Sequence, residues 1–349
     1  MLMKDVLVEE YRGEVLECVH SGHICGVDAT GAIRYSWGNP KHTTYLRSAA
    51  KPFQAIPALL HEIDVKFGFT PPEAAVMAGS HRGEPFHIEA VESMLGKIGL
   101  REQSLVCAST YPLNANARDE VVRTGGLRRR VYHNCSGKHA GVLALCQGLG
   151  YDPVTYCDPE HPAQREILRI LSMLAEVPEE QIVIGVDGCG FPVFALPLDA
   201  IARAYLKLAC PDLIAEPAVR SAVERLVMLM HTHGEMVAGT DFICSLLLSD
   251  PNIVAKGGAK GVYGIGLKKE RLAFALKVMD GSEEEWPLIV ASILEQIGYS
   301  NRDTVEKLYR ISQAHIYNDG KTQVGYSKAV FRLVQLDHSE GSESHATYD

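Results

Sequence analysis

The chain has 349 residues, of which 46% are hydrophobic and 22% charged, and its formal net charge is −9. A chain of this length can bury a large core, and this composition excludes a disordered or fibrous protein. The acidic balance argues against a nucleic-acid partner, since phosphate binding needs clustered Lys and Arg. The one basic cluster, 128–130, is interpreted as a solvated turn.

The N-terminal segment carries no apolar signal core, and no apolar run approaches the roughly 18 residues of a membrane span. The nine cysteines are an odd number scattered through apolar stretches, which is not the pattern of a disulfide framework. We therefore expect a soluble cytoplasmic protein without a membrane partner. Its cysteines are expected to stay reduced, which leaves one or two of them free for chemistry.

The predicted elements change in type along the chain. Alternating apolar residues predict strands from Gly13 to Tyr35, with hairpin turns at 21–22 and 30–31. The middle of the chain has helical periodicity, and helices are expected over 48–98, 136–148, 161–176 and 217–230. Two short apolar runs, 181–186 and 193–198, interrupt this helical region. Strand-like runs then return, followed by a helix and a last strand, at 253–256, 262–267, 271–279, 285–298 and 329–335.

This order of strands, helices and strands predicts an α+β fold. We expect a central, mainly antiparallel sheet built from both chain ends, with flanking helices and an inserted helical lobe. The sheet-containing part is placed at 1–55 and 235–336, and the mainly helical part at 56–234. The polar segment 337–349 is expected to be a disordered tail.

A possible metal pattern occurs early, in which Cys18, His20, His23 and Cys25 flank the expected turn at 21–22. In a hairpin, all four side chains can converge, and such ligands suit zinc. The alternative is two strand edges whose cysteines face the core and whose histidines face solvent. We favour that second interpretation.

Ser48 and Lys51 are three residues apart at the opening of a predicted helix, so their side chains share one face. A serine hydroxyl is a poor nucleophile at neutral pH, but a lysine whose pKa is lowered by burial can take its proton. The same S-x-x-K spacing opens the active-site helix of serine β-lactamases. By itself the pattern also fits an N-cap serine followed by an exposed lysine.

Two further residues support the first interpretation. Lys256 closes the apolar run 253–255, and in S-x-x-K enzymes a lysine on an inner strand places a second cation beside the nucleophile. Ser80, in a polar loop between helices, supplies another hydroxyl for a proton relay. An ordinary lysine at a strand end is the alternative for Lys256.

The segment Asn-Cys-Ser-Gly-Lys-His is the densest cluster of reactive side chains. Cys135 and Lys138 lie three residues apart at a predicted helix N-terminus, where the helix dipole favours a thiolate. An Asp-Gly-Cys-Gly turn brings Asp187 and Cys189 out between two short strands. Two such thiols fit a disulfide, a redox pair or a metal site, and two buried structural cysteines are the alternative. The flanking glycines favour a packed ligand site.

Taken together, these segments resemble the L-asparaginase II family of the thermolabile, rhizobial type. The resemblance runs from about residue 12 to 330, and its most specific motif is the central Asn-Cys-Ser-Gly-Lys-His segment. The segments that carry it are Glu17-x-x-His20, 47–54, Ser80-His81-x-Gly83-Glu84, 133–139, 187–190, 236–239 and 256–259.

The resemblance implies hydrolysis of L-asparagine to L-aspartate and ammonia, on a fold similar to serine β-lactamases and glutaminases, by a homodimer. It implies two Ser–Lys pairs, Ser48–Lys51 and Ser80–Lys256. It also implies a zinc ion held by Cys135, Lys138 and Cys189. The substrate-binding residues expected from the matched motifs are Arg47, His81, Asn134, His139, Asp187 and Gly239.

In the expected reaction, neutral Lys51 deprotonates Ser48, which attacks the side-chain amide carbon of asparagine. Backbone N–H groups stabilise the oxyanion, and the Ser80–Lys256 pair relays a proton to the departing ammonia. Water then hydrolyses the β-aspartyl ester. Zinc is expected to orient the substrate rather than to deliver hydroxide.

Two departures from the family pattern bear on this expectation. Lys260 stands where an acidic residue would follow, so it competes with Lys256 for one role, and Thr240-Asp241-Phe242 occupies a place where an arginine is expected. The alternatives are a glutaminase, a peptidase or another serine amidohydrolase of the same architecture, and a zinc- or amino-acid-binding protein without catalysis.

Overall fold

The computed structural model describes residues 5–312 and 314–336, so the tail predicted at 337–349 lies outside the described residues. Its strands are β1 (Val6–Arg12), β2 (Val15–Val27), β3 (Ile33–Trp37), β4 (Thr43–Tyr45), β5 (Val183–Val186), β6 (Pro192–Pro197), β7 (Ile253–Gly258), β8 (Val262–Leu267), β9 (Leu272–Val278), β10 (Ile316–Tyr317), β11 (Gln323–Ala329) and β12 (Val334–Gln335). Its helices are α1 (Lys51–Leu60), α2 (Ile63–Lys66), α3 (Pro71–Val76), α4 (Pro85–Lys97), α5 (Ala115–Arg123), α6 (Ser136–Leu149), α7 (Pro162–Ala175), α8 (Leu198–Ala209), α9 (Pro217–Thr232), α10 (Gly234–Ala238), α11 (Ile243–Leu248), α12 (Trp286–Gln296) and α13 (Arg302–Ile311).

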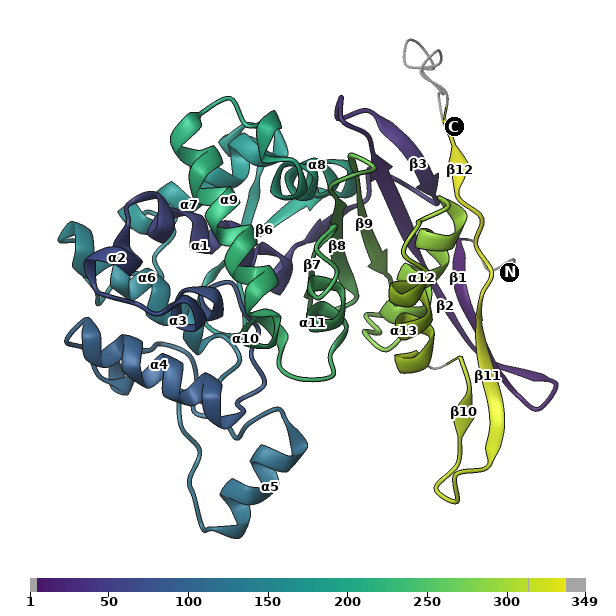
Figure 1. Cartoon of the computed structure of the whole chain (residues 1–349), viewed down its shortest axis with the longest axis horizontal. Coiled ribbons are helices and arrows are strands. Elements are labelled where there is room, and N and C mark those ends of the chain that lie inside the picture. Colours follow the sequence, from purple (N-terminus) through teal and green to yellow (C-terminus); the bar gives the residue numbers. More distant parts are fainter. Residues whose placement is uncertain (1–4, 313, 337–349) are drawn as a thin grey trace.

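The large sheet is built from both ends of the chain, as predicted (Figure 1). Its strand order is β10-β11-β1-β2-β9-β8-β7. In addition, β3 pairs with β2, and β12 pairs with β3. Every pairing in it is antiparallel, and the N-terminal strand β2 pairs directly with β9. The prediction of an α+β fold with a mainly antiparallel sheet is therefore confirmed.

The sheet separates two hydrophobic cores because successive strand residues point to opposite faces. On β9, Ala273 and Ala275 belong to the core shared with the helical region, whereas Phe274 and Leu276 belong to the core under α11, α12 and α13. Helix α8 covers the first of these faces, lying against β8 and β9. The helical region therefore packs on one face of the large sheet through α8. Lys256 lies on β7, a strand of this sheet.

The expected hairpin turn at 21–22 is wrong, because β2 runs without interruption through both residues. A Cβ on Gly22 would lie 2.1 Å from the Lys277 carbonyl oxygen, so the glycine permits close strand approach rather than a turn. The turn that does return the chain lies between β1 and β2. The second expected turn, at 30–31, is confirmed by the hydrogen bond from Asp28 N–H to Ala32 O.

Helices α1 to α7 lie between β4 and β5 in the chain, and the small sheet has the order β4-β6-β5. The two short apolar runs expected at 181–186 and 193–198 correspond to β5 and β6, whereas β4 was not predicted. In Figure 1 the helical region lies on the left of the view and the large sheet on the right. The boundaries predicted for the two parts stay a prediction, since β5 and β6 fall within 56–234 and α12 and α13 within 235–336. None of the helices in the described ranges combines the length and apolar character needed to span a bilayer.

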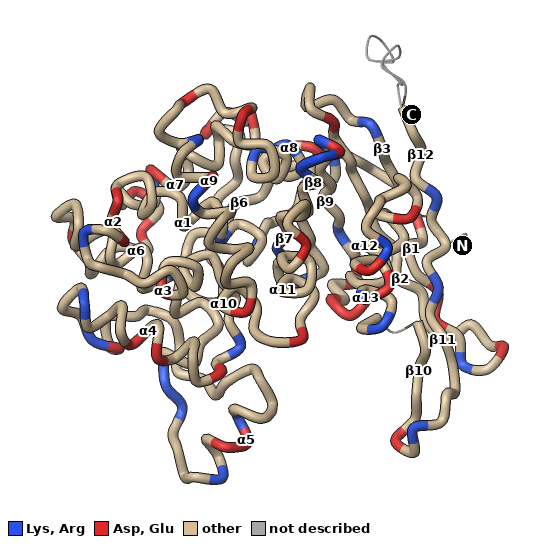
Figure 2. Tube along the Cα trace, viewed as in Figure 1, with Lys and Arg blue, Asp and Glu red and all other residues tan. Residues whose placement is uncertain are grey.

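Lys, Arg, Asp and Glu residues are scattered along the whole Cα trace rather than gathered in one region (Figure 2). Arg129 differs from the solvated turn expected at 128–130. Arg129 forms ion pairs with Glu92 at 2.5 Å and with Glu102 at 2.7 Å, so this arginine is part of a structural network.

Candidate active site

The S-x-x-K segment opens a helix, as predicted. Residues Arg47–Ala50 form a 3-10 turn that leads directly into α1, where Pro52 occupies the first turn. The backbone of Arg47 is left-handed, with φ of 50°, which is a strained conformation for a residue with a side chain. Strand β7 lies so close to this turn that a Cβ on Gly258 would be 2.2 Å from the Leu46 carbonyl oxygen.

Lys51 is the central buried cation of the site, with 1% of its surface exposed. Its Nζ donates to Ser80 Oγ at 2.9 Å and to the carbonyl oxygen of Asn134 at 3.0 Å. Burial lowers the pKa of Lys51 to about 8, because the charged ammonium is desolvated. Lys51 thus has the lowered basicity that the sequence argument required.

The contacts change the pairing expected from the resemblance. The lysine that touches Ser80 is Lys51 and not Lys256, and within the described residues no hydrogen bond joins Ser80 to Lys256. The Ser48 side chain is partly exposed, and its hydroxyl makes no hydrogen bond to any residue that the structure describes. Lys51 therefore contacts Ser80, and the described residues show no hydrogen bond between Lys51 and Ser48.

Lys256 is also buried, with 2% of its surface exposed, and its Nζ donates to the Gly257 carbonyl at 2.7 Å. Desolvation lowers its pKa as well. The Tyr205 hydroxyl donates at 2.7 Å to the carbonyl of Ala49 and at 3.3 Å to that of Lys256, which ties β7 to the S-x-x-K turn. The competing Lys260 is exposed in the turn after β7, so Lys256 is the lysine buried beside the site.

The two cysteines and the lysine expected to bind metal converge. Lys138 Nζ lies 3.3 Å from Cys189 Sγ, and the Cys135 and Cys189 side chains are in hydrogen-bonding contact. All three are buried, and Lys138 also lies 3.9 Å from the centre of the Phe191 ring. Cys135 is the residue that precedes α6, so the helix N-terminus adds a favourable dipole.

The protonation of this cluster follows from its contacts. The hydrogen bond from Cys189 and the nearby charges of Lys51 and Lys138 hold the pKa of Cys135 well below its usual range. The same contact with Cys135 raises the pKa of Cys189. Burial opposes the charge of Lys138, but the adjacent thiolate raises its pKa overall. Without a metal, the cluster is therefore a thiolate, a thiol and an ammonium.

The donor set fits a zinc ion. Zinc bonds to nitrogen and sulfur of about 2.0–2.3 Å place tetrahedral ligands about 3.3–3.8 Å apart, and the Lys138–Cys189 distance of 3.3 Å lies in this range. A metal would displace the protons of Lys138 and Cys189, as thiol and amine ligation requires. The chemistry of these three residues is thus compatible with the implied metal.

Arg47 and Asp187 form an ion pair beside this cluster. The guanidinium Nη2 and Nε lie 2.7 Å and 3.0 Å from Asp187 Oδ1, and Gly188 N–H donates to the same oxygen at 2.7 Å. Strand β4 pairs with β6, and this small sheet carries the turn that holds Asp187 and Cys189. The pair therefore links the S-x-x-K turn to the Asp-Gly-Cys-Gly turn.

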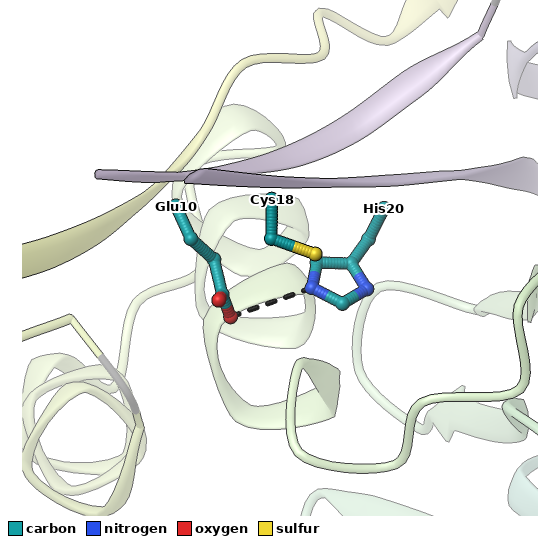
Figure 3. Close-up of side chains that lie close together, drawn as sticks. All are labelled: Glu10, Cys18 and His20. Carbon is teal, nitrogen blue, oxygen red and sulfur yellow. Dashed lines mark ion pairs between the residues drawn. The ribbon is translucent and has the colours of Figure 1, made fainter. Parts of the chain in front are cut away.

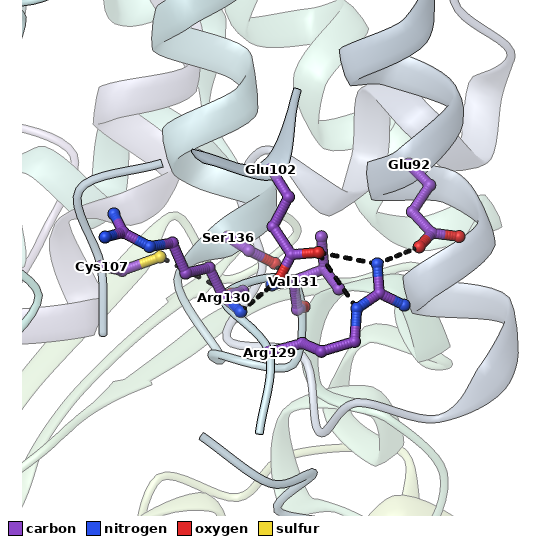
Figure 4. A network of polar contacts seen from close by, with 7 residues as sticks. All are labelled: Glu92, Glu102, Cys107, Arg129, Arg130, Val131 and Ser136. Atoms are coloured by element: carbon purple, nitrogen blue, oxygen red, sulfur yellow. Dashed lines mark hydrogen bonds and ion pairs between the residues drawn. The ribbon is translucent and has the colours of Figure 1, made fainter. Parts of the chain in front are cut away.

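The loop that precedes Cys135 is held in place by Glu102. Its carboxylate accepts from Arg129 Nε at 3.0 Å and from the Arg130 backbone N–H at 2.5 Å (Figure 4). Asn134, at the end of this loop, contacts the site through its backbone carbonyl, which accepts from Lys51. The loop network consequently positions a backbone acceptor for Lys51.

His81 and His139 were expected to bind substrate, and both are completely buried. The His81 ring lies 2.7 Å from the Ser136 hydroxyl, and His139 Nδ1 lies 2.6 Å from the Tyr156 hydroxyl. Burial lowers the pKa of each ring, so both are neutral near pH 7. In this structure they connect the Ser80 loop and α6 to their neighbours.

Gly239 ends α10 with φ of 84°, and a Cβ there would lie 2.5 Å from Glu84 Oε2. Glu84 accepts from the Thr240 hydroxyl at 2.6 Å. Glu84 and Thr240 line a cavity of about 620 Å³. The Ser80 N–H donates at 2.7 Å to the carbonyl of Val237, which lies in α10. Gly239 thus allows the chain to pass close to the loop that follows Ser80.

Two residues of this arrangement were not predicted. Phe191 packs on Lys138, and Tyr205 joins two backbone carbonyls across the site. Phe191 directly follows the Asp-Gly-Cys-Gly turn, so its position was a usable signal. Tyr205 lies within α8, a helix that the sequence analysis did not predict and whose contact with the site arises only through tertiary packing.

The comparisons with known proteins were made on sequence and on structure. A family model described as L-asparaginase II matches residues 8–329, and no curated protein matches the chain. Similar solved structures include Mglu in its native form, a beta-lactamase from Mycobacterium bovis and a Bacillus glutaminase, at 16%, 13% and 14% identity and TM-scores of 0.43, 0.41 and 0.38. The matches cover 82%, 79% and 80% of this chain.

The chain spans 62% of the Mglu chain, 94% of the beta-lactamase and 92% of the glutaminase.

Proposed function

The chain belongs to the L-asparaginase II family, and from this premise we propose that it hydrolyses L-asparagine to L-aspartate and ammonia through a Ser–Lys acyl-enzyme. Family membership makes the protein an amidohydrolase. Lys51 is buried at the opening of the S-x-x-K helix, and its Nζ lies 2.9 Å from Ser80 Oγ. This contact is the observation that carries the proposed mechanism.

In the acylation step, Lys51 in its neutral form takes the proton of Ser48, and Ser48 Oγ bonds to the side-chain amide carbon of asparagine. A pKa of about 8 supports this role, since a useful fraction of Lys51 is neutral near physiological pH. The C–N bond then breaks. The proton passes from Lys51 through the hydrogen-bonded Ser80 hydroxyl to the leaving nitrogen, which departs as ammonia.

In deacylation, water attacks the β-aspartyl ester, and the same Lys51–Ser80 pair accepts its proton. Lys256 has a different role from the one expected from the resemblance. Its charge adds to burial and to Lys138 in lowering the pKa of Lys51. We therefore assign Lys256 to the control of Lys51 basicity.

Cys135, Lys138 and Cys189 are proposed to hold zinc, and their mutual contacts support this assignment. A bound zinc ion would supply a Lewis-acid charge, with which a carbonyl or carboxylate oxygen of the substrate could be oriented. The protein side chains carry the proton transfers at Ser48, Ser80 and Lys51.

The substrate is a zwitterion, and Arg47 and Asp187 offer charges of both signs beside the site. We propose that Arg47 binds the α-carboxylate and Asp187 the α-ammonium group of asparagine. Asn134 and Gly239 shape the pocket through backbone, while His81 and His139 position its walls.

A homodimer in the cytoplasm is proposed from the family resemblance alone. Light scattering of the purified full-length chain tests the dimer, and a monomer at working concentration would contradict it.

The function is tested by measuring ammonia release from asparagine and from glutamine, with the Ser48→Ala variant as the matched protein. We expect release from asparagine by the wild type and its loss in Ser48→Ala. Faster release from glutamine would make the protein a glutaminase. Tight asparagine binding without turnover would make it a binding protein.

A further inference from the structure

A second cluster of metal-binding side chains lies on β1 and β2, outside the site described above (Figure 3). We propose that Cys18, His20, Glu10 and Glu285 bind a divalent cation of the zinc type. This second site is independent of the proposed reaction. It joins the N-terminal hairpin to the start of α12, because Glu285 directly precedes that helix.

The ligand atoms have the spacing of a coordination shell. Three ligand atoms, one each from Glu10, Cys18 and His20, lie within 4.8 Å of one another. His20 Nε2 is 3.4 Å from Glu10 Oε1 and 3.8 Å from Glu285 Oε1. Tetrahedral zinc ligands lie about 3.3–3.8 Å apart, so both carboxylates lie at ligand distance from His20 Nε2.

Two buried atoms at this point make no hydrogen bond, although His20 Nε2 lies at ion-pair distance from the Glu10 carboxylate. Neither His20 Nε2 nor Glu285 Oε2 has a hydrogen-bond partner among the residues that the structure describes. His20 is 8% exposed and Glu285 1%, so water does not replace those partners. A buried polar atom without a hydrogen bond is destabilising, and a metal ion would supply a partner to both atoms.

The other ring nitrogen of His20 is already fixed. Its Nδ1 lies 2.6 Å from Asp280 Oδ2, which favours a proton on Nδ1 and leaves the Nε2 lone pair for a metal. A carboxylate that orients a histidine in this way is typical of zinc sites. Asp280 is therefore a positioning residue.

The charge of the cluster also suits a cation. Glu10, Glu285 and Asp280 surround a single histidine, and Cys18 is exposed and accessible to a metal from solvent.

Only half of the early Cys/His pattern takes part. Cys18 and His20 are two residues apart on one continuous strand and share a face, whereas Cys25 is buried in the core. His23 Nδ1 instead accepts from Asn39 N–H at 3.1 Å. The interpretation of inward cysteines and outward histidines is thus wrong for Cys18 and His20, because the turn that it assumed does not form.

The test measures zinc bound by the full-length chain after chelation, dialysis against ZnCl2 and removal of free metal. Cys18→Ser and His20→Gln are each expected to bind one zinc per chain fewer than their parent. The loss is expected both in the wild type and in a Cys135→Ser background, which separates this site from the proposed catalytic one. His23→Gln is the matched control and is expected to keep the full content.

A second measurement covers variants that fold poorly. Asp280→Asn leaves all four ligands in place and is expected to weaken zinc affinity about 10- to 100-fold, with circular dichroism confirming the fold. Zinc is also expected to raise the melting temperature of the wild type and of His23→Gln, but not that of Cys18→Ser. Equal zinc content in folded Cys18→Ser, His20→Gln and wild type would overturn the proposal.

Discussion

The two thiol-containing clusters differ in how their charge is balanced. The cluster of Cys135, Cys189 and Lys138 contains its own ammonium, and its contacts stabilise a thiolate without any added ion. The cluster around His20 has carboxylates in excess and buried atoms without partners. The comparison teaches that convergence of ligands alone does not indicate how strongly a site requires a metal.

This difference follows from where each cluster lies in the fold. The first lies at the N-terminus of α6, where the helix dipole and two lysines supply positive charge. The second lies on a β-hairpin with no such dipole. The first cluster can therefore exist in a charge-balanced metal-free form, whereas the second is expected to depend on zinc for stability.

The largest expected effect is at Lys51, the cation that contributes to stabilising the first cluster. Lys51→Met keeps an apolar side chain of similar volume in the buried position but removes the proposed base. Ammonia release from asparagine is expected to fall at least about 1000-fold, within the range of a lost acid–base group and nucleophile activation.

The matched control is Lys260→Met, because Lys260 is exposed in the turn after β7. It is expected to retain nearly full activity. Comparable loss in both variants would mean that the buried position of Lys51 has no special role.

The pH dependence is the next largest effect. Because burial holds the pKa of Lys51 at about 8, below its ordinary value, the neutral base appears as pH rises through about 8. We expect kcat/KM for asparagine to increase from pH 7 to pH 9 and then to level off. A profile that falls over this range would contradict a lysine base.

Removal of one thiol tests the balance of the first cluster. Cys135→Ala is expected to lose one zinc per chain, measured by elemental analysis, and to lower activity on asparagine. Cys157→Ala, which changes a cysteine outside both clusters, serves as the control and should keep the metal. Zinc content equal to wild type in Cys135→Ala would remove Cys135 from the ligand set.

The smallest expected effect concerns the strand that carries the second cluster. Gly22→Ala places a methyl group against the Lys277 carbonyl and is expected to lower the free energy of unfolding by roughly 1–3 kcal/mol. Gly96→Ala, in α4 with open space around its Cβ position, is expected to raise stability by up to about 1 kcal/mol. Urea unfolding of both variants measures the contrast.

Sequence reasoning predicted the features that depend on local pattern. The periodicity of α7 and α9 and the apolar runs of β7, β8 and β9 gave elements close to those observed. The sheet from both chain ends followed from their order. Helices α5 and α13 have few buried residues, and the sequence analysis did not identify them.

The parts that could not be predicted depend on tertiary distance. Spacing places Ser48 and Lys51 together but cannot show that Lys51 reaches Ser80, 29 residues away in the chain. Gly22 looked like a turn because its close approach to Lys277 involves a distant strand. Glu285 joins His20 across more than 260 residues, so no local pattern pointed to it.

The most direct test of the central claim locates the acyl group. The full-length enzyme is mixed with asparagine, quenched in acid within its turnover time, digested and analysed by mass spectrometry. The account predicts an aspartyl ester on the peptide that contains Ser48, and none in Lys51→Met. An ester on Ser80 instead, or full turnover by Ser48→Ala without any ester, would contradict it.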